Sequence, residues 1–332
     1  GKKYALVNYA DNFNPATKNS EESVFATQSS VNDGSVSFFN WGNGNGGDVL
    51  NFPLHGPGGP CCGFFQPSQY LVNHFKTDPV TGLPDLDNFN ARDVKNDAGF
   101  MSSDPFIPYD GTLDPRLDWT VGRRGIPYLD WGNHTGYDWV RNQDDGGPYS
   151  PIKNVYYKEQ EGRLSDLSFW AKGITANNVN LIRFADVLLW AAEAEIEIGN
   201  LEKAKEYVNR VRTRAQNPTG WVKRPDGTPA ANYKIGLYTE PWTDRALARK
   251  SVRYERILEL AMEGHRFFDL VRWGIADTEI NAYLQKEKFL RNYLNDAVFK
   301  KNCNEYFPIP QKQIDLSAGA DGIPKMKQNN II

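Results

Sequence analysis

Residues 181–216 read LIRFADVLLWAAEAEIEIGNLEKAKEYVNRVRTRAQ and predict two helices joined by a tight turn. The apolar residues expected on the inner faces are Ala185, Leu188, Leu189, Ala192 and Ile196 in the first helix and Ala204, Tyr207, Val208 and Val211 in the second. They recur at the spacing of one helical face. Gly199 and Asn200 end the first helix, because glycine tolerates the left-handed backbone that follows a helix. The pattern is typical of one tetratricopeptide-type hairpin, which must stack on other helices to bury its own face.

Further helices are expected after this hairpin. The apolar spacing predicts a long helix over 245–273 and another over 277–300. Between them and the hairpin, segment 217–244 contains four prolines and is expected to be a loop. The tail EYFPIPQKQIDLSAG, 305–319, is expected to form extended chain and turns.

The first 180 residues have a different sequence pattern. Short β-like runs, such as SVFATQ (23–28) and SVSFF (35–39), are separated by turn-rich stretches such as NWGNGNGGD (40–48). This much irregular chain in a compact protein usually carries function. We therefore predict a mainly α fold with long irregular loops and short strands. Its two regions would be a loop-rich ligand-binding region, 1–180, and a helical region, 181–332.

Composition excludes several classes of protein. The chain has 332 residues and a net charge of −3, with basic and acidic residues mixed, so it lacks the basic block typical of nucleic-acid binding. No apolar run approaches the ~20 residues that span a bilayer. The three cysteines, Cys61, Cys62 and Cys303, form no CxxC pair typical of zinc. Neighbouring cysteines rarely bridge, so we expect no disulfide framework. We also expect no bound metal and no cofactor.

The segment RYERILELAMEGHRFFDLVRWG, 253–274, brings a histidine, carboxylates and arginines together. One interpretation makes His265 and Asp269 a base and its orienting group, or two metal ligands. A metal site would need a third ligand at compatible spacing, as in HExxH, and none is evident. The other interpretation is a charged seam between helices, with the pairs Arg256–Glu259, Glu263–Arg266, His265–Asp269 and Asp269–Arg272 on one helix. We favour the charged seam.

Six motifs resemble the SusD/RagB family of surface lipoproteins. ERILELAMEGHRFFDLVRWG (255–274) resembles the signature helix of that family. The other five are EESVFATQSS (21–30), PSQYLVNHFKTDPVTG (67–82), DPRLDWTVGRRGIPYLDWG (114–132), LIRFADVLLWAAEAEIEIGN (181–200) and YFPIPQKQI (306–314). They occur in the order of the family and cover nearly the whole chain. The resemblance implies a SusD-like fold, in which tetratricopeptide-type hairpins support a loop-rich binding region.

The resemblance also implies a function. Proteins of this family are non-enzymatic binding subunits on the cell surface of the outer membrane, anchored by an N-terminal lipid. They capture oligosaccharides, or peptides in some branches, and pass them to a TonB-dependent, SusC-like outer-membrane transporter. Family members carry a further N-terminal region with the lipid-bearing cysteine. We therefore expect this chain to be the C-terminal portion of a longer protein, with its lipid outside the chain.

Aromatic residues in loops identify candidate ligand-binding positions. Trp and Tyr offer rigid apolar faces for the C–H face of a sugar, and nearby Asn, Asp or Arg can pair with hydroxyl groups. Two segments have this chemistry, FFNWGNGNGGDVLNF (38–52) and LDWTVGRRGIPYLDWGNHTGYDWVRNQDD (117–145). The candidates are Trp41, Asn43, Asn45, Asp48, Trp119, Tyr128, Trp131, Tyr137 and Trp139. For the second segment, the competing interpretation is that its aromatic rings pack the loop onto the helices.

Other interpretations of these loops remain open. GNGNGG (42–47) satisfies the dinucleotide pattern G-x-G-x-x-G, but the following DVLNFP does not suit the helix that such a site requires. Asn43, Asn45 and Asp48, or Asp85 and Asp87, could line a cation loop, without full EF-hand spacing. A glycoside hydrolase would need two carboxylates, for which the candidates are Asp130, Asp138, Asp144 and Asp145. A third possibility is a purely structural partner of a transporter.

Overall fold

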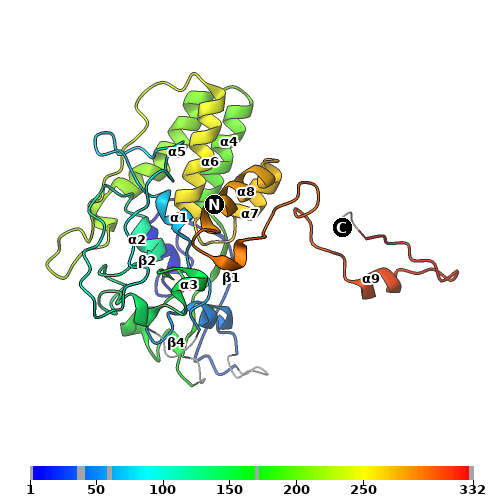
Figure 1. Cartoon of the computed structure of the whole chain (residues 1–332), viewed down its shortest axis with the longest axis horizontal. Helices are drawn as coiled ribbons and strands as arrows, with labels where there is room; N and C mark the ends of the chain where they lie inside the picture. Colours follow the sequence, from blue (N-terminus) through cyan, green and yellow to red (C-terminus); the bar gives the residue numbers. More distant parts are fainter. Residues whose placement is uncertain (1–2, 36–41, 58–61, 169–171, 329–332) are drawn as a thin grey trace. The chain divides into compact units, whose positions relative to one another are not determined.

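The computed structural model describes residues 3–35, 42–57, 62–168 and 172–328. The chain forms two compact units, Gly1–Gly264 and His265–Ile332. Within the described residues the structure is mainly helical, with long loops and three small two-stranded sheets, which confirms the predicted fold class (Figure 1).

Three long helices pack together in the first unit: α4 (Phe184–Glu197), α5 (Leu201–Gln216) and α6 (Arg245–Leu260) (Figure 1). The first two are the predicted hairpin, and α6 is the neighbour on which it stacks. The buried side chains between them are Ala185, Leu188, Leu189, Ala192, Ile196, Ala204, Val208, Val211, Trp242, Ala248 and Val252. Alanines at four of these positions leave room for close approach of the backbones.

The ends of these helices follow ordinary capping chemistry. Gly199 has a φ of +91° at the end of α4, as expected for a left-handed residue after a helix. Asp244 caps α6, because its carboxylate accepts hydrogen bonds from the backbone N–H groups of Ala246 and Leu247 at 2.7 and 3.3 Å.

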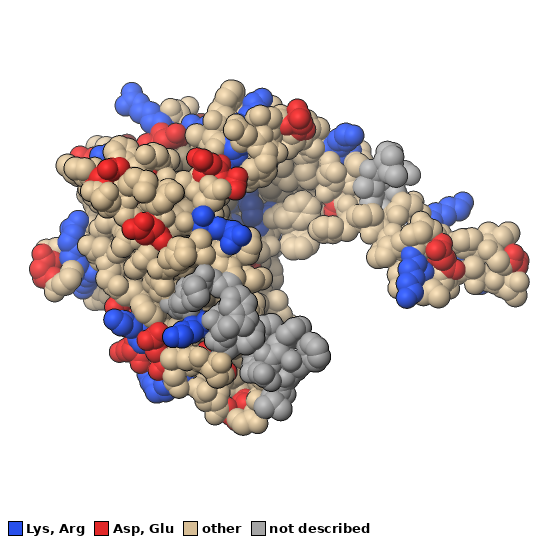
Figure 2. All heavy atoms as spheres, turned by 60° about the horizontal axis from the view of Figure 1, so that its bottom comes forward, with Lys and Arg blue, Asp and Glu red and all other residues tan. Residues whose placement is uncertain are grey.

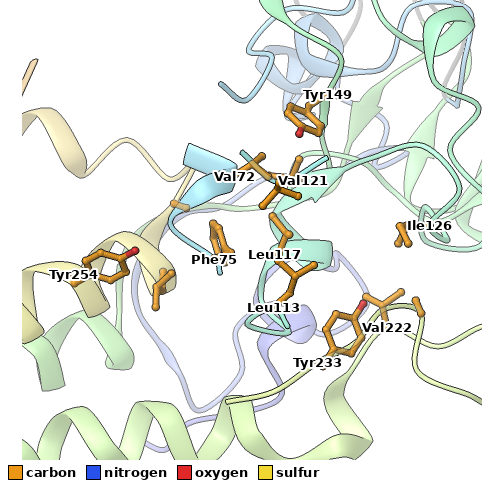
Figure 3. Close-up of a cluster of buried hydrophobic side chains, with 14 residues drawn as sticks. Val72, Phe75, Leu113, Leu117, Val121, Ile126, Tyr149, Val222, Tyr233 and Tyr254 are labelled. Atoms are coloured by element: carbon orange, nitrogen blue, oxygen red, sulfur yellow. The ribbon is translucent and has the colours of Figure 1, made fainter. Parts of the chain in front are cut away.

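A second apolar core holds the loop-rich part of the first unit against α6 (Figure 3). It contains residues from α1 (Gln69–Asn73), α2 (Leu117–Thr120) and the loop after α5. Val72, Phe75, Leu113 and Leu117 are fully buried here, and Tyr254 of α6 joins them. Loops in this region are therefore folded onto a core rather than left in solvent.

Three antiparallel strand pairs bring distant parts of the first unit together. β1 (Ser23–Thr27) pairs with β6 (Val179–Arg183), with Ser23 opposite Arg183 and Thr27 opposite Val179. β2 (Val121–Gly122) pairs with β3 (Ser150–Pro151), and β4 (Ser165–Asp166) pairs with β5 (Ile174–Thr175). The predicted strand within 21–30 is confirmed, whereas most of SVSFF lies outside the described residues.

Short helical turns complete the first unit. These are η1 (Tyr9–Phe13), η2 (Gly46–Asn51), η3 (Tyr137–Trp139), α3 (Gln143–Gly146), η4 (Lys158–Gln160) and η5 (Pro218–Gly220). The second unit contains α7 (Arg266–Arg272), α8 (Ala276–Glu287), η6 (Asn292–Leu294) and α9 (Gln311–Leu316).

The predicted continuous helix over 245–273 is wrong. Helix α6 ends at Leu260, and a turn of four residues, 261–264, precedes α7. Met262 and Gly264 have φ angles of +64° and +86° in this turn, a conformation that cannot continue a right-handed helix. The helix predicted over 277–300 ends at Glu287, and the tail contains the short helix α9, which the sequence pattern does not predict.

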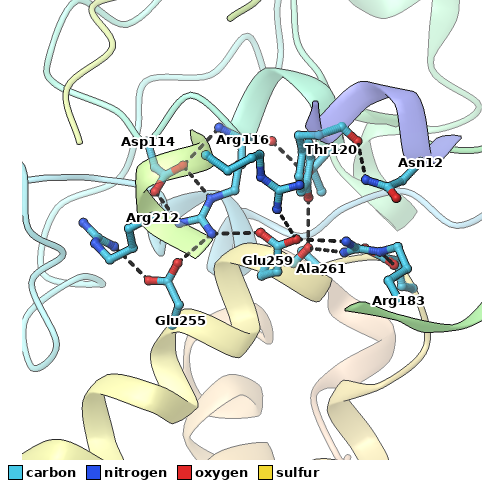
Figure 4. Close-up of polar contacts among 12 residues, drawn as sticks. Asn12, Asp114, Arg116, Thr120, Arg183, Arg212, Glu255, Glu259 and Ala261 are labelled. Atoms are coloured by element: carbon cyan, nitrogen blue, oxygen red, sulfur yellow. Dashed lines mark hydrogen bonds and ion pairs between the residues drawn. The ribbon is translucent and has the colours of Figure 1, made fainter. Parts of the chain in front are cut away.

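Buried ion pairs join α6 to the rest of the first unit (Figure 4). Glu255 accepts hydrogen bonds from Arg116 at 2.6 Å and Arg212 at 2.8 Å. Glu259 lies within 2.5–3.1 Å of Arg116, Arg183 and Arg214. Burial by itself would raise the pKa of Glu259, but the three guanidinium groups outweigh it and hold that pKa well below its usual range. Every one of these side chains is at most 8% exposed.

This arrangement corrects the predicted seam. Arg256 pairs with Asp186 of α4 at 2.6 Å, not with Glu259, and Glu263 pairs with Arg183 and Lys153. The predicted pair Asp269–Arg272 is found, at 2.8 Å. The charges do bind helices and loops together, but in the interior rather than on an exposed helix face.

Two remaining features concern the surface and the cysteines. Figure 2 shows lysine and arginine interspersed with aspartate and glutamate over the face drawn. Among the described residues, none of the helices has the length and apolarity needed to cross a membrane. Cys62 is disulfide-bonded, contrary to the expectation from sequence.

Candidate functional site

A pocket of about 240 Å³ lies in the first unit and is lined mainly by polar side chains. Five asparagines line it: Asn45, Asn154, Asn177, Asn178 and Asn180. We call it the asparagine pocket; its other lining residues are Phe13, Asp48, Phe65, Lys153, Val179, Met262, Glu263 and Gly264. These residues come from separate parts of the chain, so the pocket exists only in the folded unit.

Strands β5 and β6 position the asparagines. The backbone N–H of Asn45 donates to the carbonyl of Thr175 in β5 at 2.8 Å, and its side-chain NH2 donates to the carbonyl of Asn177 at 3.3 Å. The side-chain NH2 groups of Asn177 and Asn180 donate to the carbonyls of Phe13 and Asn12 at 3.0 and 2.7 Å. These amide NH2 groups therefore serve to fix the pocket wall.

Asp48, in η2, is a buried carboxylate at the pocket. The Thr175 hydroxyl donates to it at 2.9 Å and the Asn154 NH2 group donates at 3.1 Å. Burial raises the pKa of Asp48 to about 7, because these two hydrogen bonds only partly replace the lost hydration. Asp48 is 5% exposed, so it is set in the wall of the pocket rather than at its rim.

Asn154 presents an unused acceptor. Its Oδ1 atom is buried and has no hydrogen-bond partner among the described residues. A buried carbonyl oxygen without a donor typically costs about 1–3 kcal/mol. Because Asn154 lines the pocket, a hydroxyl group of a bound molecule could supply the missing donor.

Lys153 and Glu263 form a buried ion pair in the pocket lining. The Lys153 ammonium donates to Glu263 Oε1 and to the Ala261 carbonyl, both at 2.7 Å. Burial lowers the pKa of Lys153 to about 8, with Glu263 opposing that shift. Arg183 donates to both carboxylate oxygens of Glu263, at 2.8 and 2.9 Å. For Glu263, burial acts to raise the pKa, but Arg183 and Lys153 outweigh it and lower the pKa.

These contacts hold the turn 261–264 in place. Met262 adopts a left-handed φ of +64° and lines the pocket. A non-glycine residue in this conformation costs about 1–3 kcal/mol and persists only where its surroundings enforce it. Here the Lys153 bond to Ala261 and the Glu263 ion pairs enforce it on both sides of Met262.

Apolar side chains complete the pocket lining. Phe65 is 49% exposed and also has a left-handed backbone, with a φ of +61°. Phe13 packs edge-on against Tyr9, with ring centroids 5.4 Å apart, and the Lys153 ammonium lies 4.5 Å from the Phe13 ring centroid. The pocket thus combines an exposed aromatic ring with amide and carboxylate oxygens.

The first predicted segment partly coincides with this pocket. Asn45 and Asp48 both line it. Asn43 is exposed and donates to Asp33 at 3.0 Å, and it is not among the lining residues. Trp41 lies outside the described residues.

The second predicted segment is used largely for packing. Tyr128 is 0% exposed and donates its hydroxyl to the Pro151 carbonyl, so its ring has no free face for a ligand in this structure. Trp119 and Trp131 are half-buried, and their indole N–H groups donate to the carbonyls of Gly220 at 2.7 Å and Tyr156 at 2.8 Å. Trp139 packs edge-on against Tyr128 at 5.8 Å. Tyr137, at 45% exposed, has the freest ring of the five.

Most of the pocket was not predicted from the sequence. Lys153, Asn154, Phe65 and the asparagine run were not candidates. A signal was present for the run, because Asn177-Asn178-Val179-Asn180 places three amides in four residues immediately before and within a strand. Nothing in the sequence connects that run to η2 or to Asn154.

Several residues considered for other chemistries have structural partners in the fold. No group of three or more potential His, Cys, Asp or Glu ligands for a metal occurs within the described residues. Asp85 accepts a hydrogen bond from the backbone N–H of Asp87 in a turn, and Asp87 forms an ion pair with Lys250. The Asp130 carboxylate accepts hydrogen bonds from the backbone N–H groups of Lys158 and Glu159 at 2.6 and 3.0 Å. Asp144 and Asp145 lie at the N-terminus of α3, which Asn142 caps.

The family model of the SusD family matches residues 21–331. The chain belongs to the SusD family. A curated SusD-like protein, P25 of Formosa agariphila, is 38% identical over 101 residues, which are 30% of this chain and 16% of that protein.

Solved structures share the fold of this SusD-family chain. Surface glycan-binding protein A from Bacteroides fluxus gives a TM-score of 0.58 at 20% identity, covering 99% of this chain and 55% of that one. The protein of the same name from Bacteroides thetaiotaomicron, in complex with laminarihexaose, gives 0.55 at 21% identity, covering 99% and 56%. The chain therefore spans about half the length of these structures.

Proposed function

We propose that this SusD-family chain belongs to a non-catalytic glycan-binding protein of the cell surface, and that the asparagine pocket is part of its binding site. The observation that carries the proposal is the unpartnered, buried Oδ1 atom of Asn154 in a pocket lined by four further amides. A hydroxyl group of a ligand can supply the donor that this acceptor lacks among the described residues, and sugars are rich in hydroxyl donors.

The remaining lining fits the same ligand class. The half-exposed ring of Phe65 offers an apolar face to the C–H side of a sugar ring. Asn45 and Asp48 supply further oxygen acceptors. Tyr137, which does not line the pocket, stays a candidate for additional contacts along a longer glycan chain. Trp41, which lies outside the described residues, stays a candidate as well. The likeness to a protein solved with laminarihexaose supports an oligosaccharide as the ligand.

Family membership also supports the wider context. In this proposal a lipid anchors the protein to the cell-surface side of the outer membrane. In this proposal, a TonB-dependent SusC-like transporter receives the captured oligosaccharide. The chain itself holds the sugar and performs no chemistry on it.

Titration calorimetry with a panel of neutral oligosaccharides, including laminarihexaose, and a matched panel of peptides tests the proposal. We expect at least one oligosaccharide to bind and Asn154→Ala to weaken it about tenfold, which corresponds to about 1.4 kcal/mol. Asn133→Ala is the matched control, because Asn133 is exposed and does not line the pocket. Binding of peptides alone, or equal affinity in the wild type and Asn154→Ala, would contradict the proposal.

A further inference from the structure

The charges of the asparagine pocket restrict which sugar it can take, provided that the proposed glycan-binding function holds. The pocket lining includes two carboxyl groups, Asp48 and Glu263, and one cation, Lys153. No arginine among the described residues lines it. Proteins that recognise carboxylate or sulfate groups commonly use arginine, whose planar fork pairs with two oxygens at once.

The cation in the pocket is already engaged. The Lys153 ammonium donates to Glu263 and to the Ala261 carbonyl, both at 2.7 Å. Glu263 in turn is held by both Nε and Nη2 of Arg183. Two of the three ammonium donors of Lys153 are thus used, and the Glu263 carboxylate already neutralises its charge. An anionic ligand would therefore gain less from this cation than from an unpaired one.

The other polar atoms disfavour an anion directly. Asn154 presents Oδ1, an acceptor, and Asp48 presents carboxylate oxygens in a buried setting. The oxygens of a uronic acid or a sulfate cannot donate to these atoms. Placing such a charge beside them would add repulsion where water is largely excluded. A hydroxyl group, by contrast, can donate to either atom.

The size of the pocket sets a second limit. At about 240 Å³ it falls below the range of about 300–1,000 Å³ that is typical of pockets for drug-sized ligands. A pocket of this volume suits one sugar ring, which can stack on the exposed ring of Phe65. A longer chain would have to lie outside the pocket and place one residue in it.

We infer that the asparagine pocket holds a single uncharged sugar residue, at the end or on a branch of a neutral glycan, and rejects uronic acid and sulfated residues. The selectivity arises from Asp48, the acceptor of Asn154 and the buried Lys153–Glu263 pair.

Matched pairs of ligands test this inference. The probes are neutral oligosaccharides of glucose, galactose and mannose, each compared with an oligosaccharide of the corresponding uronic acid, which differs only at C6. We expect the neutral member of the preferred pair to bind at least tenfold more tightly in calorimetry. The titrations are made at pH 8, above the Asp48 pKa of about 7, where Asp48→Asn removes a charge at nearly constant shape and is expected to reduce this ratio. Asp226→Asn, in an exposed loop, is expected to leave the ratio unchanged.

The outcomes separate this inference from the proposed function. If uronic acid oligosaccharides bind as tightly as neutral ones, or more tightly, the inference fails while glycan binding stands. If no glycan of either kind binds, both fail. Should Asp48→Asn not fold, as judged by thermal melting, the affinity ratio of the wild-type protein decides by itself.

Discussion

At the scale of single residues, the buried charged side chains near α6 stabilise the fold. Glu259 meets three arginines, so its carboxylate is a buried counter-charge that all three share. Each arginine also pairs with a second carboxylate. The sequence shows that these charges are present, but their partners lie up to 143 positions away. Local helical spacing therefore paired Glu259 with the wrong arginine, because tertiary contacts and not neighbouring turns neutralise it.

Replacing Glu259 by glutamine should lower the free energy of unfolding by about 3–5 kcal/mol, since it removes one buried partner that three guanidinium groups share. Urea denaturation measures this loss. Glu197→Gln is the control, because Glu197 pairs with Arg249 on the surface, and its removal should change stability little. Equal, small effects for both variants would show that the buried network contributes nothing beyond a surface pair.

The buried carboxyl group of Asp48 should make the free energy of unfolding depend on pH. Its pKa rises from 3.8 in the unfolded chain to about 7 in the folded one, through burial. Between these values the folded state binds more protons than the unfolded state, so this contribution to stability is complete below pH 3.8 and is lost as pH rises to about 7. The total change is on the order of 4 kcal/mol.

Denaturation of the wild type and Asp48→Asn across this pH range isolates the contribution. The wild type should lose stability relative to Asp48→Asn as pH increases. A constant difference between the two proteins would show that Asp48 is not buried as described. Other carboxylates, including Glu259, titrate in both proteins and cancel in the comparison.

At the scale of elements, the α4–α5 hairpin could be predicted and the turn after α6 could not. Apolar spacing and the Gly199 stop signal are local properties, so they fix the hairpin. The turn at 261–264 interrupts a sequence with good helical spacing. It is held by Lys153 and Arg183, which lie far away in the chain. Long-range ion pairs of this kind leave no periodic signal.

The packing of the hairpin leads to a prediction about Leu189, which is 0% exposed between the helices. Leu189→Ala should lower the free energy of unfolding by about 2–5 kcal/mol, through lost burial and the cavity left behind. Leu247, which is 52% exposed on α6, provides the control, and Leu247→Ala should have a much smaller effect. Chemical denaturation of both variants compares the two directly.

The turn after α6 leads to a second prediction. Gly264 has a φ of +86°, and a Cβ atom added there would meet nothing within 4 Å. Gly264→Ala should therefore cost about 1–2 kcal/mol from backbone strain alone. Gly220→Ala serves for comparison, because Gly220 has no positive φ and its nearest atom is 3.8 Å away. A thermal shift equal in the two variants would contradict the strained turn.

At the scale of the whole molecule, family membership was predictable because six motifs are spread along the chain, and the match over 21–331 confirms it. The site was only half predictable. Asn45 and Asp48 lie in a loop whose composition drew attention to it, whereas Lys153 and Asn154 reach the same pocket from the segment after β3. Several loop aromatics, Tyr128 above all, are used for packing instead.

The central claim is that the asparagine pocket receives a sugar ring, and a crystal structure of the chain with a bound neutral oligosaccharide tests it most directly. We predict a ring inside the pocket, with one hydroxyl donating to Asn154 Oδ1 and one apolar face toward Phe65. A bound sugar located elsewhere, with the pocket filled only by water, would contradict the account.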